Sequence, residues 1–336
     1  PVFLHEMFKD NPFYRGIRTV VTIHNLRFQG VWDIPAMKRF TGLPDRAFTP
    51  DRLEFHRDAN MLKGGLVYAD RITTVSGTYA WEIQQPSFGE GLDGLLRAKS
   101  GTLSGILNGI DYDIYDPVTD RKLYANYDKN GVRQGKAANK AALQRELALP
   151  EDPEVMMVGM ITRLTDQKGL DLVERVMDWL LTSRIQLVII GTGDKKYEDL
   201  FRRYEWERKE KVSANIYFND DRAHKLYAAA DAMLMPSLFE PCGLTQLNAM
   251  HYGTLPIVRE TGGLKDTVEP YNNFTGDGNG FTFDRYDAGL LLDAINRAKT
   301  VYFTNRYHWD EIVQRDMAKD VSWENSAKQY KDLYLE

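Results

Sequence analysis

The chain has 336 residues, 43% of them hydrophobic and 27% charged, a composition typical of globular proteins at a length that suggests two domains. Its formal net charge of −5 gives no electrostatic reason to expect a nucleic acid or an anionic membrane as a partner. The longest apolar stretches, residues 187–190 and 228–235, are far shorter than the ~20 residues that a membrane span needs. Cys242 is the only cysteine, so no intrachain disulfide can form, and the first residues lack the features of a secretory signal. These observations predict a cytoplasmic protein.

Short β-rich apolar runs alternate with amphipathic helical patterns, which is typical of an α/β fold with parallel sheets. The chain begins in what reads as the end of a helix. In the first part we predict strands over residues 19–23, 71–75 and 103–107 and a helix over residues 61–69. Residues 111–130 are polar and rich in turn formers and are interpreted as a linker, after which a helix is predicted over residues 136–147.

The second part of the chain alternates more regularly between the two kinds of element. Strands are predicted over residues 155–161, 187–190, 215–218, 232–235 and 255–258, with helices over residues 170–181, 197–209, 222–230 and 244–251. This succession predicts a doubly wound nucleotide-binding domain. From residue 288 to the C-terminus the pattern is helical, with Trp309, Trp323, Tyr330 and Tyr334 as expected packing anchors.

Two cations lie in the loop after the first strand of this second domain. In open α/β sheets, ligands bind beyond the carboxyl ends of the strands. Arg163 and Lys168 could converge there on a diphosphate, because arginine supplies a planar fork of donors and lysine a movable point charge. The alternative is that both are solvated surface cations.

A second loop with chemical potential follows the strand predicted at residues 232–235. Glu240 lies there between a phenylalanine and a proline, and Gly243 would let a ligand approach the N–H groups of Leu244 and Thr245. The alternative is a glutamate that caps the helix, favoured by the helix dipole. Residues 260–264 form a predicted glycine turn with further backbone N–H groups, although a Gly-Gly pair is usually only a turn.

Two further motifs are interpreted as structural. Residues 191–194, GTGD, carry only part of a dinucleotide fingerprint and occur at the second β-α unit, so NAD binding is not predicted. Residues 111–116, DYDIYD, have no histidine or glutamate nearby to complete a ligand set, so we expect a solvated turn and no metal site.

Five strings in order along the chain resemble glycogen and starch synthases: TIHNLRFQG (22–30), GILNGID (105–111), TRLTDQKGLDL (162–172), PSLFEPCGLTQL (236–247) and TGGLKDTV (261–268). The resemblance covers essentially the whole chain and implies a retaining enzyme of glycosyltransferase family 5. It implies a GT-B fold, with two doubly wound Rossmann-like domains facing a cleft. The implied reaction is transfer of glucose from ADP-glucose to the non-reducing end of an α-1,4-glucan such as glycogen, without a cofactor or a metal.

The resemblance also implies residue roles. Arg163 and Lys168 would bind the donor diphosphate and stabilise the charge that develops on the leaving group. Glu240 would face the donor glucose, His24 would contact a glucose hydroxyl, and Asn108 would help to position the reacting sugar. Phe218 would stack on the nucleotide base. The other expected substrate-binding residues are Cys242, Gly243, Leu244, Thr245, Thr261, Gly262, Gly263 and Leu264.

The sequence departs from the family pattern in two places. Asn248 stands where related retaining glucosyltransferases carry a second glutamate, which favours the glycogen synthase group. The family's lysine-x-glycine-glycine-leucine loop is missing ahead of the first string, and residues 63–66 imitate it only within a helix. We therefore expect an incomplete N-terminal acceptor-side domain with linker over residues 1–132 and a nucleotide-sugar-binding domain over 133–310. Residues 311–336 are expected to form a helix that packs back on the first domain.

Two other functions remain open at this point. One is a UDP-glucose-dependent glucosyltransferase of another GT-B family, because a stacked phenylalanine would accept uracil as well as adenine. The other is a nucleotide-binding fragment without activity, and we expect this chain on its own to be inactive.

Overall fold

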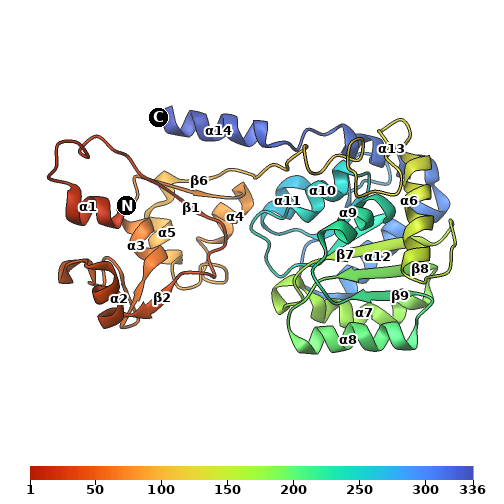
Figure 1. The fold of residues 1–336 in the computed structure, drawn as a ribbon, viewed down its shortest axis with the longest axis horizontal. Helices are drawn as coiled ribbons and strands as arrows, with labels where there is room; N and C mark the ends of the chain where they lie inside the picture. The colour runs from red at the N-terminus through yellow and green to blue at the C-terminus, as the bar shows by residue number, and fades with distance from the viewer. Residues whose placement is uncertain (336) are drawn as a thin grey trace. The chain divides into compact units, whose positions relative to one another are not determined.

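The structure, a computed structural model, describes residues 1–335, and the chain divides into two compact units, Pro1–Leu107 and Asn108–Glu336 (Figure 1). Each unit is built around its own parallel sheet. Among residues 1–335, none of the helices combines the length and apolar character that crossing a membrane requires. The domain boundaries expected from the sequence stay a prediction.

The first unit contains a three-stranded parallel sheet of β1 (Val20–Ile23), β5 (Arg71–Thr74) and β6 (Leu103–Gly105), in the order β1-β5-β6. These are the three predicted strands, shorter by one or two residues. α3 (Met61–Tyr68) confirms the predicted helix, α4 (Gly77–Glu82) follows β5, and α5 (Asp93–Ala98) precedes β6. Ile23, Ile72, Leu66, Tyr79 and Leu96 are buried together in the core of this sheet.

The first unit also contains a small antiparallel sheet, which the sequence did not predict. Its strands are β2 (Val31–Asp33), β4 (Asp58–Asn60) and β3 (Glu54–Phe55), paired in that order. Strands of two or three residues are too short to show an alternating pattern. The other elements of this unit are α1 (Val2–Phe8), α2 (Ile34–Thr41) and two 3-10 turns, Asp45–Ala47 and Ser100–Thr102.

The second unit has a six-stranded parallel sheet with the strand order β12-β11-β10-β7-β8-β9. The strands are β7 (Met156–Ile161), β8 (Ile185–Ile190), β9 (Val212–Asn215), β10 (Ala232–Met235), β11 (Leu255–Arg259) and β12 (Phe281–Phe283). This is the Rossmann order 3-2-1-4-5-6 read from the opposite edge, so the predicted doubly wound fold is confirmed. The strand predicted at residues 215–218 is wrong, because the chain leaves the sheet after Asn215 and Phe218 is 88% exposed.

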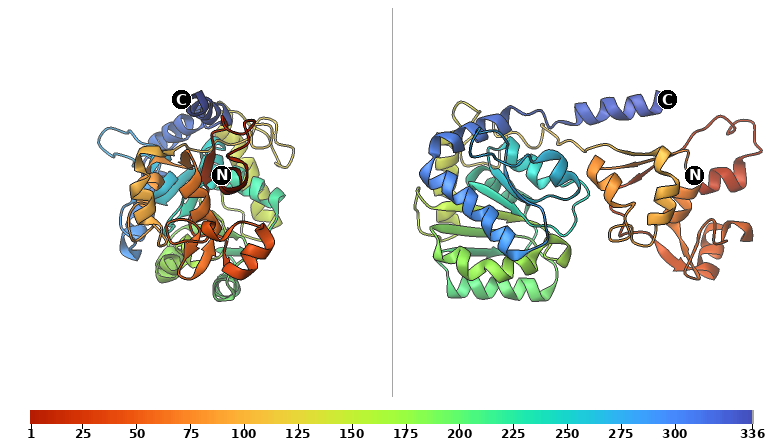
Figure 2. Two further views of the ribbon diagram at one scale, coloured as in Figure 1. Left: turned by 90° about the vertical axis from the view of Figure 1, so that its left-hand side faces the viewer. Right: turned by 180° about the vertical axis from the view of Figure 1, so that it is seen from behind.

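Helices cover both faces of this sheet. α7 (Leu170–Thr182) and α8 (Lys195–Glu207) lie on one face and α9 (Asp220–Ala229) and α10 (Thr245–His251) on the other (Figures 1 and 2). The remaining helices are α6 (Val132–Glu146), α11 (Gly262–Thr267), α12 (Ala288–Thr304), α13 (Arg306–Ala318) and α14 (Trp323–Leu335). Of the expected anchors in the C-terminal run, Trp309 is buried, whereas Trp323 and Tyr334 are exposed.

The segment interpreted as a linker is attached to the second unit by a buried network. Residues 111–130, all of which the structure describes, contain neither helix nor strand. Asp120 is nevertheless buried, 2.6 Å from His224 Nδ1, and it accepts a hydrogen bond from the Tyr252 hydroxyl at 2.7 Å. The segment is therefore a packed part of the second unit, although Asp111 and Asp113 lie in an exposed turn as expected.

Candidate functional site

The site lies where the strand order of the second sheet reverses. β7 and β10 are neighbours, and the chain continues from β7 toward one edge of the sheet and from β10 toward the other. In doubly wound folds this switch point opens a crevice beyond the carboxyl ends of the two strands. The loops that follow are residues 162–168 after β7 and residues 236–244 after β10, which carry both groups of residues singled out in the sequence.

Lys168 and Glu240 meet at this point. Lys168 ends the 3-10 turn Asp166–Lys168, and its Nζ donates to Glu240 Oε2 at 2.6 Å. The Ser237 hydroxyl donates to the same carboxylate oxygen at 3.0 Å. Glu240 is only 6% exposed and the Lys168 side chain 16%, so the two charges form a largely desolvated ion pair. Glu240 therefore does not cap α10, whose N-cap residue is Leu244, and Lys168 is not a solvated surface cation.

The two loops are joined to each other by one backbone hydrogen bond and one hydrogen bond from a side chain. Leu238 N donates to Gln167 O at 2.9 Å, and Gln167 Nε2 donates to Phe239 O at 3.3 Å. Gly169 follows Lys168 with a φ of +70°, and a Cβ there would overlap the Pro236 carbonyl oxygen. Only glycine therefore permits this approach, which fixes where Lys168 lies relative to Glu240.

Arg259 was not predicted from the sequence, and its side chain holds the Glu240 loop through hydrogen bonds to two backbone carbonyls. It is buried at the end of β11, its Nε donates to Ser237 O at 2.7 Å, and its Nη2 donates to Leu238 O. The signal in the sequence was a charged residue that ends an otherwise apolar strand. A guanidinium that binds two successive carbonyls holds the loop in one conformation.

The glycine turn predicted at residues 260–264 is instead the beginning of α11, with Thr261 at the N-cap position. A Cβ at Gly262 would overlap the Glu240 carbonyl oxygen, and a Cβ at Gly263 would overlap that of Cys242. Gly263 N also donates to Glu240 O at 3.1 Å. The two glycines thus let α11 pack directly on the backbone of the Glu240 loop, and Leu264 is buried behind them. Their proposed contact with substrate stays a prediction.

Cys242 lies deep in the same loop. The thiol is 5% exposed, and burial raises its pKa to about 11, while a backbone hydrogen bond from Asn108 acts in the opposite direction. Gly243 has a left-handed conformation, and its carbonyl and that of Cys242 accept hydrogen bonds from Gln246 Nε2. Leu244 and Thr245 follow at the start of α10, with Leu244 partly exposed.

Three further predicted site residues are exposed. Arg163 is exposed in the loop after β7. Phe218 is exposed beyond β9, the edge strand of the sheet. His24 belongs to the other unit, where it is exposed directly after β1. Their roles toward donor and acceptor stay predictions.

The GTGD motif has a structural explanation. A Cβ at Gly191 would overlap the Thr162 carbonyl oxygen, and a Cβ at Gly193 would overlap that of Leu164. Leu164 N donates to Thr192 O at 2.9 Å, so the glycines seat the loop after β8 against the loop after β7. Within residues 1–335 we find no group of three or more His, Cys, Asp or Glu side chains that could hold a metal ion.

Comparison with known proteins gives the class first. A sucrose-phosphate synthase from Thermosynechococcus elongatus has the same fold, with a TM-score of 0.58 at 21% identity over 94% of this chain and 67% of that chain. Residues 139–309 match the family model of glycosyl transferases group 1. The fold and the switch-point site therefore define a glycosyltransferase with the GT-B fold.

Closer relatives give the family. Residues 1–98 match the model of the starch synthase catalytic domain. The glycogen synthase of Lachnospira eligens is 57% identical over 334 residues, which are 99% of this chain and 70% of that protein. The catalytic domain of starch synthase IV from Arabidopsis thaliana, solved with ADP and acarbose, has a TM-score of 0.89 at 34% identity and covers 99% of this chain and 70% of that chain. The chain belongs to the glycogen synthase and starch synthase family, as its motifs predicted.

Proposed function

We propose that the protein transfers glucose from ADP-glucose to the non-reducing 4-hydroxyl of an α-1,4-glucan, with retention of configuration. The observation that carries the proposal is the Lys168–Glu240 ion pair at the switch point of a nucleotide-binding fold. The solved relative that binds ADP and acarbose, a nucleoside diphosphate and an oligosaccharide analogue, supports both substrate classes.

The pair suggests how the donor is bound. A diphosphate carries more negative charge than one carboxylate and would draw the Lys168 ammonium from Glu240. Glu240, still held by the Ser237 hydroxyl, would then be available to accept hydrogen bonds from the glucose hydroxyls. Arg163, on the same loop, would add a second cation to the phosphates.

The transfer step follows from the same arrangement. As the bond between the glucose C1 and the diphosphate oxygen breaks, negative charge grows on the departing phosphate, where Lys168 and Arg163 stabilise it. The acceptor 4-hydroxyl attacks C1 from the same face, and its proton passes to the departing phosphate oxygen. Proton and charge thus balance within donor and acceptor.

Calorimetric titration of the chain with ADP and with UDP tests the donor assignment. We expect ADP to bind more tightly than UDP, and Lys168→Ala to weaken ADP binding by about 10- to 100-fold, the loss of one charge-assisted contact. Lys209 is exposed two residues after the end of α8. Lys209→Ala is therefore the matched control, and it should bind ADP as tightly as the parent protein does.

The outcomes separate the candidate functions. Preferential binding of UDP would favour a glucosyltransferase of another GT-B family. Binding of neither nucleotide by a chain that melts cooperatively would rule out the diphosphate site. Incorporation of glucose into glycogen tests the transfer reaction itself.

A further inference from the structure

A pocket of about 390 Å³ lies at the amino ends of the strands of the second sheet, whereas the Lys168–Glu240 pair lies beyond their carboxyl ends. It is lined by α6, the end of α12, the start of α13 and the segments that precede β7, β10 and β11. The volume is in the range of small-molecule sites. Its walls carry Arg133, Lys136, Lys140 and Arg306 against Glu154, Asp231 and Asp310, so cations outnumber carboxylates.

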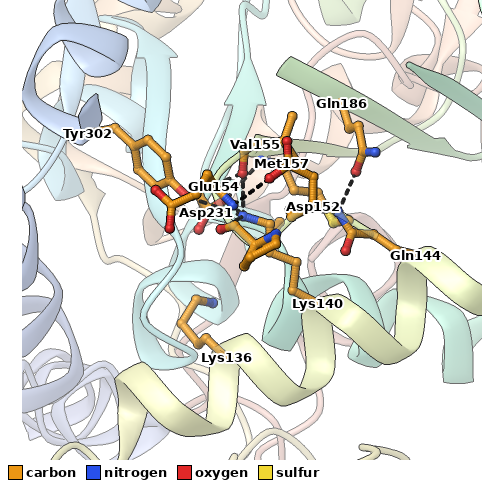
Figure 3. A network of polar contacts seen from close by, with 12 residues as sticks. Lys136, Lys140, Gln144, Asp152, Glu154, Val155, Met157, Gln186, Asp231 and Tyr302 are labelled. Carbon is orange, nitrogen blue, oxygen red and sulfur yellow. Dashed lines mark hydrogen bonds and ion pairs between the residues drawn. The ribbon is translucent and has the colours of Figure 1, made fainter. Parts of the chain in front are cut away.

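One cation of the pocket is fully compensated. Lys140 Nζ donates to Asp231 Oδ2 at 2.7 Å and to the Tyr302 hydroxyl at 3.1 Å, and it also contacts the Val155 carbonyl (Figure 3). Asp231 in turn accepts from Met157 N at 2.7 Å. Both charges are buried, and this pair stabilises the fold without needing a ligand.

Lys136 lies beside this pair without a carboxylate of its own. Among residues 1–335 its Nζ reaches neutral acceptors only, namely the carbonyls of Tyr227, Ala228 and Tyr252 at 3.1–3.2 Å and the Thr254 hydroxyl at 2.7 Å. No carboxylate oxygen within residues 1–335 comes within 4.0 Å of it. Burial lowers the pKa of Lys136 to about 7; Asp231 acts in the opposite direction, and Lys140 and Arg306 act in the same direction.

The two arginines at the pocket share one carboxylate loosely. Arg306 Nε is 3.6 Å and Arg133 Nη1 3.9 Å from Asp310, both too long for hydrogen bonds. The Arg306 guanidinium also lies over the Tyr302 ring, 4.1 Å from its centroid. Asp310 can balance only one of the two charges, so guanidinium N–H groups remain for an anion.

We propose that this pocket binds a small oxyanion, a phosphate or phosphate monoester, between Arg133 and Arg306. The Lys136 ammonium, which lines the same pocket, would add a third positive charge. Guanidinium forks match the oxygens of phosphate. The buried ring of Trp309 and the partly exposed ring of Phe303 would face the carbon body of a monoester. The site is separate from the donor site, because it lies at the amino ends of β7 and β10 whereas the Lys168 and Glu240 loops follow their carboxyl ends.

Titration calorimetry with inorganic phosphate and with glycerol phosphate tests the proposal on the full chain. The Lys168→Gln background removes the candidate diphosphate site, and we expect phosphate binding to persist in it. Adding Arg306→Gln or Arg133→Gln should weaken binding about 10-fold or more. The Arg133 side chain is 71% exposed, so the Arg133→Gln protein should fold normally. The Arg133 variant therefore tests the site even if Arg306→Gln impairs folding. Lys209→Gln is the matched control and should change nothing.

Proton uptake gives a second readout. An anion beside Lys136 favours its charged form, so binding at pH 7.5 should take up protons, measured in two buffers of different ionisation enthalpy. Lys136→Met should abolish the uptake. The other charged groups facing Lys136 across the pocket, Lys140, Asp231, Arg306, Arg133, Asp310 and Glu154, stay in place in this variant. Phosphate affinity that is lost in Lys168→Gln, or that is unchanged in both arginine variants, would overturn the proposal.

Discussion

At the level of single residues, the site is defined by an ion pair whose partners lie 72 positions apart in the sequence. The sequence singled out Lys168 and Glu240 separately, each as the charged residue of a loop after a strand. It did not predict that they neutralise each other, because their contact depends on which strands are neighbours. Arg259 was not predicted, because a charged residue at the end of an apolar strand does not by itself show which carbonyls it binds.

Replacing Glu240 should have the opposite effect on ADP affinity from replacing Lys168, which should weaken ADP binding. Glu240→Gln removes the counterion of Lys168 and leaves the ammonium available to the nucleotide phosphates, so ADP should bind roughly 3- to 10-fold more tightly. Ser237→Ala keeps the carboxylate charge and should change ADP affinity less. Both are measured by titration calorimetry. Weaker ADP binding by Glu240→Gln would show that the carboxylate itself contacts the nucleotide.

Asp316 predicts a pH dependence of stability. It is 1% exposed on α13, and burial raises its pKa well above the usual value, although Lys319, Asn279 and Arg315 act in the opposite direction. The native state therefore keeps a proton that the unfolded chain releases above about pH 4. The free energy of unfolding should fall as the pH rises from there until the native carboxyl also ionises.

The variant Asp316→Asn tests this sign. The neutral amide removes the penalty, so at pH 8 the variant should be more stable than the parent by about 1–3 kcal/mol, with little difference near pH 4. Urea unfolding at both pH values measures it, with the exposed Asp332→Asn as a control. An equal effect at pH 4 and pH 8 would show that ionisation is not the cause.

At the level of elements, prediction succeeded where the apolar pattern was long. β10 has the predicted bounds, 232–235, and α7 differs by one residue from the predicted helix. β9 was misplaced because Val212, Ser213 and Asn215 are buried although only one of them is apolar, whereas the apolar Phe218 is exposed. The antiparallel sheet of the first unit was missed because its strands are held by neighbours rather than by a pattern of their own.

The contact between α11 and the Glu240 loop predicts an asymmetric response to glycine replacement. Gly263→Ala places a methyl group against the Cys242 carbonyl, and we expect it to lower the free energy of unfolding by about 1–3 kcal/mol and to weaken ADP binding. Gly94→Ala within α5, where the nearest atom is 3.9 Å away, should instead stabilise by up to about 1 kcal/mol. Thermal unfolding with and without ADP compares them. A Gly263→Ala protein as stable as the parent would show that the loop can move away.

At the level of the whole molecule, the two units differ in how much they bury. The core of the second unit consists of one large cluster that reaches all six strands and one small cluster around Leu247 and Met250, whereas the first unit has two smaller clusters and six strands of two to four residues. Buried apolar area is the main stabilising term, so the units should differ in stability. The doubly wound class of the second unit was predictable from its regular alternation, but its sixth strand, β12, and the size of the first unit's core were not.

Hydrogen exchange measured by mass spectrometry tests this difference and the site together. We expect amides of β7, β8 and β10 to exchange more slowly than those of β1, β5 and β6, because opening the larger core costs more free energy. ADP at about 100 times its Kd should add roughly 2.7 kcal/mol of protection to the second unit, most visibly at residues 162–169 and 236–245. The first unit should keep its exchange rates, since Lys168 and Glu240 both belong to the second. Equal protection of both sheets would contradict the difference in core size, and an ADP effect confined to the first unit would contradict the donor site.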